Sequence, residues 1–208
     1  MGRGFVIVLS APSGAGKGTL AAHLLETMSA LRWSVSTTTR APRPGEVAGE
    51  AYHFVDVDTF CKRLEQDAFL EWAQVFGNYY GTERANVESV LANGEDLILD
   101  IDWQGARQVR AKLPADAVVS IAILPPSRQA LQERLEGRCT DDPQVIARRM
   151  AQAGEEIAHW QEYDYLLVND DLQRACQDLA AIITAERLRR ARERVPVQKI
   201  LATFAESM

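Results

Sequence analysis

The segment APSGAGKGT, residues 11–19, combines glycines with a lysine at the spacing of a phosphate-binding loop (P-loop). The backbone N–H groups of such a turn can surround phosphate oxygens, and the helix that follows favours negative charge at its N-terminus. Lys17 can reach the β- and γ-phosphates of a nucleoside triphosphate. A chance glycine-rich turn is the alternative, but an apolar run, Phe5–Ser10, precedes the loop and a helical pattern, Lys17–Ala30, follows it. The residues expected to contact the triphosphate are Ser13, Gly14, Ala15, Gly16, Lys17, Gly18 and Thr19.

Two positions of the loop differ from the pattern GxxxxGK[ST]. Ala11 stands at the first glycine, which requires only that this residue keeps a negative φ angle. Gly18 stands at the hydroxyl position and lacks the oxygen that commonly binds Mg²⁺, and Thr19 comes one residue too late to replace it. We therefore expect Mg²⁺ to be held by nucleotide oxygens, waters and a carboxylate such as Asp100, which ends an apolar run. The alternative role for Asp100 is the N-cap of the next helix.

Apolar runs of strand length alternate with helical patterns along the chain. Strands are expected at Phe5–Ser10, Trp33–Thr37, Asp96–Ile101, Ala117–Leu124 and Tyr165–Val168. Helices are expected at Lys17–Ala30, Glu83–Asn93, Gln104–Leu113, Arg128–Glu136, Pro143–Glu162 and Leu172–Arg194. Near-continuous apolar strands separated by helices indicate a three-layer α/β fold with a five-stranded parallel sheet. Such sheets bind ligands at the carboxyl ends of their strands.

Two segments interrupt this alternation. Residues 38–82 contain short strand patterns at Tyr52–Val55 and Phe69–Phe76 and a helix that begins near Asp58, so we expect a small inserted α+β subdomain. Residues 125–162 start with two prolines and carry most of the arginines, which suits a mobile helical lid. The expected single domain has a core of residues 1–37, 83–124 and 163–195 and a C-terminal tail of residues 196–208.

The composition limits the partners of the protein. With 208 residues and 47% hydrophobic content, the chain can bury one substantial core. A formal net charge of −6 disfavours nucleic acid as a partner, because that binding depends on a surplus of lysine and arginine. The apolar runs are too short to cross a bilayer, and three cysteines without a CxxC pair indicate neither a disulfide framework nor a zinc site. We expect a cytoplasmic protein with no membrane contact and no nucleic-acid partner.

Arginines gather in three places. Arg40 and Arg43 lie close in sequence, a second group runs from Arg134 to Arg149, and residues 187–194 form a basic stretch that we interpret as a solvated helix face. The first two groups suit phosphate, because guanidinium groups stay charged and bind phosphate bidentately. When the acceptor of a phosphoryl group is itself a phosphate, it is largely dianionic at neutral pH and needs no general base. Transfer then depends on in-line alignment and on charge stabilisation by the lid arginines.

Motifs more specific than the phosphate-binding loop are spread between Val6 and Leu188. They are SAPSGAGK (Ser10–Lys17), SVSTTTRAPRPGE (Ser34–Glu46), YHFV (Tyr52–Val55), FLEWAQVFGNYYGT (Phe69–Thr82), ILDIDWQG (Ile98–Gly105), PPS (Pro125–Ser127), RLEGR (Arg134–Arg138) and VNDDL (Val168–Leu172). With these motifs the sequence resembles the guanylate kinases, nucleoside-monophosphate kinases that convert ATP and GMP into ADP and GDP. The resemblance implies ATP-dependent phosphorylation of GMP and dGMP with Mg²⁺ as cofactor.

The resemblance also implies an acceptor site. The residues similar to the family's clamp on the acceptor phosphate are Arg40, Arg43, Tyr52 and Tyr80, two guanidinium forks and two phenol donors. The residues similar to its guanine-binding groups are Ser36, Glu71, Thr82 and Asp102. This chemistry is sound, because a carboxylate accepts hydrogen bonds from guanine N1–H and the 2-amino group, a pair that adenine cannot offer. A hydroxyl can donate to guanine O6.

The donor site follows from the same resemblance. The catalytic residues that it implies are Lys17, Arg40 and three lid arginines, Arg134, Arg138 and Arg149. These arginines resemble those that meet the triphosphate and the transferred phosphoryl group. Asn169, at the end of the last expected strand, resembles a contact to the adenine of ATP.

The sequence departs from the family at Gly18, where a serine is usual, and at Cys139, which follows Arg138. Neighbouring arginines tend to lower the pKa of a thiol, so Cys139 is either a reactive thiol at the phosphate site or an inert replacement for a small residue. Two other functions share part of this pattern. A kinase of a phosphorylated sugar such as ribose 1,5-bisphosphate would give Glu71 and Ser36 nothing to recognise. A non-catalytic guanylate-kinase-like binding domain would generally lack Lys17 and the acceptor arginines.

Overall fold

The computed structural model describes residues 2–75, 77–137, 142–192 and 197–205. Its main sheet has five strands in the order β2, β7, β1, β8, β9, and every neighbouring pair is parallel. The strands are β1 (Val6–Ser10), β2 (Leu31–Trp33), β7 (Asp96–Asp100), β8 (Val118–Leu124) and β9 (Tyr165–Val168). The predicted five-stranded parallel sheet is confirmed, with the fully buried β1 at its centre.

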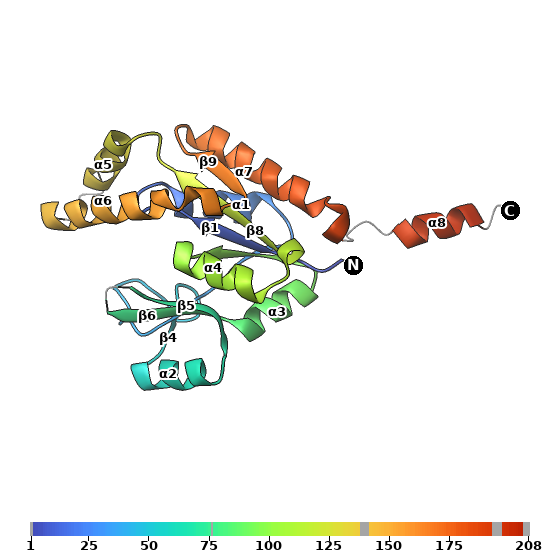
Figure 1. Cartoon of the computed structure of the whole chain (residues 1–208), viewed down its shortest axis with the longest axis horizontal. Helices are drawn as coiled ribbons and strands as arrows, with labels where there is room; N and C mark the ends of the chain where they lie inside the picture. The colour runs from blue at the N-terminus through green and yellow to red at the C-terminus, as the bar shows by residue number, and fades with distance from the viewer. Residues whose placement is uncertain (1, 76, 138–141, 193–196, 206–208) are drawn as a thin grey trace.

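Helices cover both faces of the main sheet (Figure 1). They are α1 (Lys17–Thr27) and α7 (Leu172–Arg187) on one face and α3 (Arg84–Ala92) and α4 (Trp103–Lys112) on the other. α1 and α7 share a core with Ile7 and Leu9 of β1, whereas α3 and α4 share one with Val6 and Val8. Successive strand residues point to opposite faces, so the continuous apolar run of β1 supplies both cores. The predicted three-layer α/β fold is confirmed.

A second sheet of four strands lies beside the main one, in the order β4, β3, β6, β5 (Figure 1). Its strands are β3 (Thr37–Thr38), β4 (His53–Phe54), β5 (Phe69–Val75) and β6 (Asn78–Glu83). The helix α2 (Val57–Glu65) packs against this sheet. Phe60 of α2 stacks on Phe69 of β5, with ring centroids 4.4 Å apart, and on Tyr79 of β6 at 5.3 Å. These aromatic rings form the core that joins helix and sheet.

The prediction of one strand over Trp33–Thr37 is wrong. Ser34 N–H still donates to Ile98 O of the main sheet at 2.9 Å, but Ser36 O accepts from His53 N–H, at the start of β4, at 2.9 Å. Trp33 therefore ends β2, whereas Thr37 begins β3 of the other sheet. The chain changes sheets within a run whose composition is suited to strands throughout.

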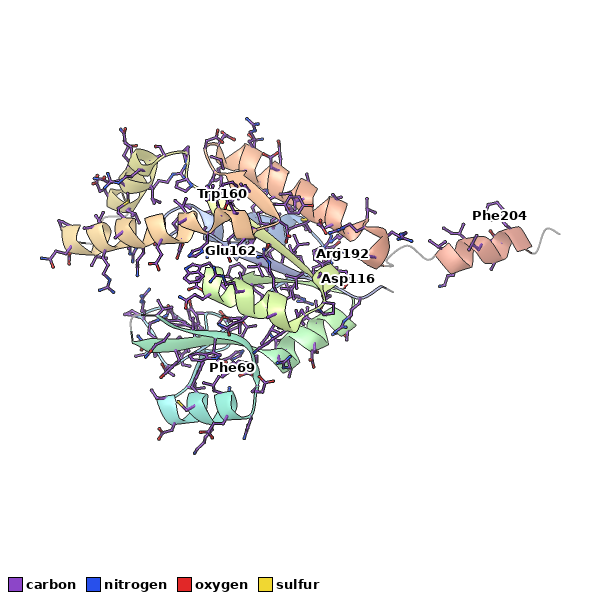
Figure 2. All side chains as sticks on the ribbon, viewed as in Figure 1. Phe69, Asp116, Trp160, Glu162, Arg192 and Phe204 are labelled. Carbon is purple, nitrogen blue, oxygen red and sulfur yellow. The ribbon has the colours of Figure 1, made fainter. Side chains whose placement is uncertain are left out.

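The segment predicted to be a lid contains two helices, α5 (Arg128–Glu136) and α6 (Pro143–Ala158), followed by a 3₁₀ turn, Trp160–Glu162. The helix predicted over Pro143–Glu162 is therefore four residues too long. His159 caps the end of α6, and its ring stacks on Trp103 of α4, with ring centroids 3.9 Å apart. Glu162 accepts two hydrogen bonds from Arg107, at 2.7 and 2.6 Å, and these bonds lower the pKa of Glu162 to about 2. The base of the lid is thus fixed to α4, near Trp160 and Glu162 in Figure 2.

The C-terminal helical region also differs from the prediction. α7 ends at Arg187, a 3₁₀ turn covers Arg190–Arg192, and α8 (Val197–Ala205) follows. The interpretation of residues 187–194 as a solvated face is wrong for Arg187, which binds Asp96, and for the buried Arg192. Figure 2 shows Arg192 next to Asp116, whose backbone oxygen accepts from its guanidinium group. Within the described ranges, no helix is long and apolar enough to cross a membrane.

Candidate active site

The phosphate-binding loop joins β1 to α1 at the carboxyl end of the central strand. Gly14 and Gly16 have φ angles of 95° and 96°, in the left-handed region where only glycine is free of strain. The loop closes on itself through a hydrogen bond of 3.0 Å from Ala15 N–H to Pro12 O, and Lys17 is the first residue of α1. This is the strand, glycine turn and helix N-terminus that an anion site requires. Ser13, Gly18 and Thr19 are exposed around it.

Lys17 contacts Asp100 of the neighbouring strand β7. Lys17 Nζ forms an ion pair with Asp100 Oδ1, and Asp100 is the last residue of β7, the neighbour of β1. The side chains are 18% and 41% exposed, so both can reach a ligand. The N-cap considered for Asp100 is instead supplied by Asp102, whose Oδ1 accepts from Gly105 N–H of α4 at 2.9 Å.

The described lid arginines approach the loop from two helices. Arg134 of α5 donates through Nη2 to the backbone oxygen of Asn169 at 2.8 Å, while its Nη1 is buried without a partner in the described part of the chain. Arg149 of α6 donates to Ser13 Oγ at 3.4 Å. Arg138 and Cys139 lie outside the described residues. Asn169 is buried and donates its side-chain N–H to Ala15 O at 2.8 Å.

Glu156 of α6 is a residue at this site that the sequence did not identify. Together with Tyr163 and Trp160 it lines a small hollow against Ser10 and the start of the loop. Desolvation by burial raises the pKa of Glu156 to about 7, and the negative charges of Asp100 and Asp102 add to this shift while Lys17 opposes it. Glu156 Oε2 has no partner among the described residues. A glutamate on an amphipathic helix is usually solvated, so its sequence position carries no signal of this contact.

A second polar cluster lies in the small sheet and in the loop after β3. Arg40 donates to Glu46 Oε1 at 2.8 Å and to Ala41 O at 2.7 Å, and its guanidinium carbon is 5.3 Å from the ring centroid of Tyr52. The rings of Tyr52 and Tyr80 meet edge to face at 6.0 Å. The structure therefore brings Arg40, Tyr52 and Tyr80 together. Burial raises the pKa of Tyr52 above its ordinary value, and the negative charge of Asp100 adds to this shift.

Glu46 organises this second cluster and was not predicted. Its Oε2 accepts from Arg43 N–H at 2.8 Å while its Oε1 accepts from Arg40. The hydrogen bond from Arg40 lowers the pKa of Glu46, and the same bond raises the pKa of Arg40. The side chain of Arg43 is exposed. Glu46 thus holds the turn in which both arginines stand, although its position three residues after Arg43 was the only signal of this contact.

The residues predicted to recognise guanine lie at the junction of the small sheet and α4. Glu71 of β5 is only 4% exposed and pairs in register with the buried Thr82 of β6. Desolvation by burial raises the pKa of Glu71 from 4.5 to about 7. A β carbon at Gly105 would lie 2.8 Å from Glu71 Oε2, so the Glu71 carboxylate packs closely against α4. Ser36 lies half-buried just before β3, and Asp102 is partly engaged as the N-cap of α4.

The sequence matches the family model described as Guanylate kinase over residues 3–186. It is 56% identical over 196 residues to the guanylate kinase of Escherichia coli (strain K12), covering 93% of this chain and 94% of that protein. It is 55% identical over 187 residues to the guanylate kinase of Shewanella sp. (strain MR-7), covering 89% of each. The crystal structure of guanylate kinase from Anaplasma phagocytophilum is similar in fold, with a TM-score of 0.75 at 35% identity over 98% of this chain and 96% of that chain. The chain therefore belongs to the guanylate kinase family of enzymes.

Proposed function

We propose that this protein transfers the γ-phosphoryl group of ATP to the phosphate of GMP or dGMP, giving ADP and GDP or dGDP. The observation that carries the proposal is the position of Asp100. It pairs with Lys17 of the phosphate-binding loop, and its negative charge contributes to the raised pKa of Tyr52 in the Arg40 cluster. A donor triphosphate on the loop and an acceptor phosphate on that cluster would thus face each other across one carboxylate. The bond from the γ-phosphorus to its bridging oxygen breaks, and a bond to an oxygen of the acceptor phosphate forms.

The loop, Lys17 and the lid arginines would bind the donor. The loop offers backbone N–H groups, and Lys17 offers a point charge to the β- and γ-phosphates. Arg134 Nη1 is buried with no partner in the described ranges, and Arg149 already contacts Ser13, so both suit a phosphate arriving at the loop. Charge that develops on the transferred group would be stabilised by these cations. We assign Arg138 to the same set, and residues 125–162 act as the lid that excludes water.

The donor set fits Mg²⁺ held largely by the nucleotide. No group of three or more His, Cys, Asp or Glu in the described part of the chain could hold a metal by itself. Asp100 is an exposed carboxylate at the loop, and Mg²⁺ commonly uses one or two carboxylates with waters and phosphate oxygens. When bound there, Mg²⁺ would neutralise negative charge on the triphosphate. The exposed Gly18 offers no side-chain oxygen to it.

Residues 38–82 would bind the acceptor nucleotide. Arg40, Tyr52 and Tyr80 are already together, and the acceptor phosphate would take the place of the Glu46 carboxylate on Arg40, with Arg43 joining it. A dianionic phosphate needs no general base, so these residues only position it and balance its charge.

Guanine would be selected at the other end of this site. Ionised Glu71 would accept from N1–H and the 2-amino group, and the hydroxyls of Ser36 and Thr82 would bind O6, with Asp102 nearby. Because burial raises the pKa of Glu71 to about 7, base recognition would strengthen as the pH rises through that value.

The test is ATP-dependent ADP release measured with GMP, dGMP, AMP, dTMP and ribose 1,5-bisphosphate. GMP and dGMP should be the best acceptors, and Arg40→Ala should lower kcat/KM for GMP about 10- to 100-fold, as expected for loss of charged hydrogen bonds. Arg174→Ala removes an exposed arginine of α7 and is the matched control. AMP turning over as fast as GMP, or ribose 1,5-bisphosphate faster, would contradict guanine recognition. No turnover with tight GMP binding would indicate a binding domain.

A further inference from the structure

Asn169 forms a hydrogen bond with the backbone of the phosphate-binding loop. The residue follows β9 and is 4% exposed, and its backbone N–H donates to Leu124 O of β8 at 2.8 Å. Its side-chain Nδ2 donates to Ala15 O of the loop at 2.8 Å. The loop carbonyl is therefore bound by a residue that is itself fixed to the main sheet.

This hydrogen bond determines the direction of a loop N–H group. In a trans peptide, the carbonyl of Ala15 and the N–H of Gly16 point in opposite directions. When Asn169 holds the Ala15 carbonyl on the protein side, Gly16 N–H is turned to the other side, where a loop of this kind receives phosphate. A β carbon at Gly16 would lie 2.3 Å from Asn169 Nδ2, so the amide occupies the space that the missing side chain leaves.

The backbone of Asn169 also orients a lid arginine. Its carbonyl accepts from Arg134 Nη2 at 2.8 Å, which leaves Nη1 of the same guanidinium group buried without a partner among the described residues. One residue thus connects the loop and α5. A guanidinium group held by one nitrogen presents the other in a fixed direction, because its donors are coplanar.

We propose that Asn169 is a positioning residue that sets the loop N–H groups and Arg134 for the triphosphate, rather than a contact to adenine. The assignment deepens the proposed function, since it rests on the loop as the site of ATP phosphates. It concerns phosphates alone, so it predicts the same effect on a ligand without a base.

The experiment compares the affinities of ATP and inorganic tripolyphosphate by titration calorimetry of wild type, Asn169→Ala and Asn169→Asp. Both variants remove the Nδ2 donor. Asn169→Asp nearly keeps the shape but adds a carboxylate that faces the Ala15 carbonyl, so the size of the effect is taken from Asn169→Ala. Both ligands should weaken by a similar factor of about 10, the loss expected for one hydrogen bond. In turnover, the KM for ATP should rise more than kcat falls, and the KM for GMP should stay unchanged. Asn93→Ala, at the exposed end of α3, is the matched control.

The binding measurement needs neither GMP nor turnover, so it is independent of the proposed reaction. Weaker ATP binding with unchanged tripolyphosphate binding would overturn the assignment in favour of an adenine contact. Unchanged affinity for both ligands, or failure of wild type to bind tripolyphosphate, would also overturn it. Circular dichroism and thermal unfolding check the fold, and loss of folding in both variants would make Asn169 a core residue instead.

Discussion

The two ends of the main sheet treat their buried polar groups differently. At the amino end of the strands, Asp96, Glu186 and Arg192 are buried and each is held by hydrogen bonds and ion pairs. Around the carboxyl ends and the lid, several buried polar atoms have no partner in the described part of the chain. They include Ser34 Oγ, Arg134 Nη1 and Glu156 Oε2.

The partners at the amino end come from the protein itself. Asp96 accepts from Phe5 N–H at 3.1 Å and from Arg187 Nε at 2.8 Å. Glu186 accepts from Arg192 Nη2 and from the hydroxyl of Tyr165, both at 2.6 Å. Arg192 also lies over the ring of Phe5, 3.8 Å from its centroid.

This difference indicates that the amino end of the sheet contributes to stability and the carboxyl end to ligand binding. A buried polar group without a partner costs about 1–3 kcal/mol, and a protein keeps such groups where a ligand can satisfy them. The buried polar groups of the amino end already have partners within the protein. Removing one of these partners should therefore affect folding and leave catalysis intact. The carboxyl end should behave in the opposite way.

The largest effect is expected at the amino end. Arg192→Met removes the buried guanidinium partner of the buried Glu186, and such a broken pair lowers the free energy of unfolding by about 3–5 kcal/mol. Urea denaturation measures this loss, and kcat of the folded enzyme should not change. Arg189→Met is the matched control, because Arg189 binds the same glutamate but is 60% exposed and should contribute less than about 1 kcal/mol. A loss of kcat in Arg192→Met would break the division between the two ends.

Lys17→Ala tests the carboxyl end. Loss of this cation should lower kcat about 10²–10³-fold, or about 3–4 kcal/mol in activation free energy. The free energy of unfolding should change by less than about 1 kcal/mol, because the pair with Asp100 is partly exposed. Steady-state ADP release and urea denaturation, with Arg174→Ala as control, measure the two quantities. A kcat within tenfold of wild type would contradict the proposed role of Lys17.

These two ends were not equally predictable from the sequence. The loop, its strand and its helix are local in sequence, so glycine spacing and apolar periodicity predicted them. At the amino end, the ion pair of Arg187 and Asp96 joins residues far apart in sequence, and a basic stretch at helical spacing gives no sign of it. The same holds for the change of sheet after Trp33, because strand composition does not identify the partner strand.

The site was predicted in part, and its remainder depends on tertiary contacts. The resemblance supplied Arg40, Tyr52 and Tyr80, which the structure brings together, but it did not supply Glu46 or Glu156. Whether a glutamate is solvated or buried near the loop depends on helix packing, which local pattern does not contain.

Glu71→Gln should have a smaller effect that depends on pH. Burial raises the pKa of Glu71 from 4.5 to about 7, so between these values the unfolded chain loses a proton that the folded chain keeps. The free energy of unfolding therefore falls as the pH rises through this window. Glutamine removes the effect and should stabilise the protein by up to about 3 kcal/mol at pH 8, with little gain at pH 4.

Urea denaturation from pH 4 to pH 8 measures the effect, with the exposed Glu88→Gln as control. Burial also raises the pKa of Glu156, so the free energy of unfolding of Glu71→Gln should still fall in part as the pH rises. In the same variant, the KM for GMP should rise and lose its dependence on pH near 7. If Glu71→Gln had the same free energy of unfolding and the same KM for GMP as wild type, Glu71 would contribute neither to stability nor to binding.

Gly18→Ser is expected to have the smallest effect and addresses where Mg²⁺ is held. A β carbon at Gly18 meets nothing within 4 Å, so serine fits, and its better helix propensity should add about 0.5 kcal/mol of stability. Gly154→Ser on α6 is the matched control, because its β carbon is equally unhindered and the residue is exposed. Both variants should gain similar stability. Only Gly18→Ser should lower the Mg²⁺ concentration for half-maximal activity, by a factor of about 2–5. The reason is that one hydroxyl ligand adds to a site built mainly from phosphate and water. An unchanged Mg²⁺ dependence would place the ion on the side of Asp100, out of reach of residue 18.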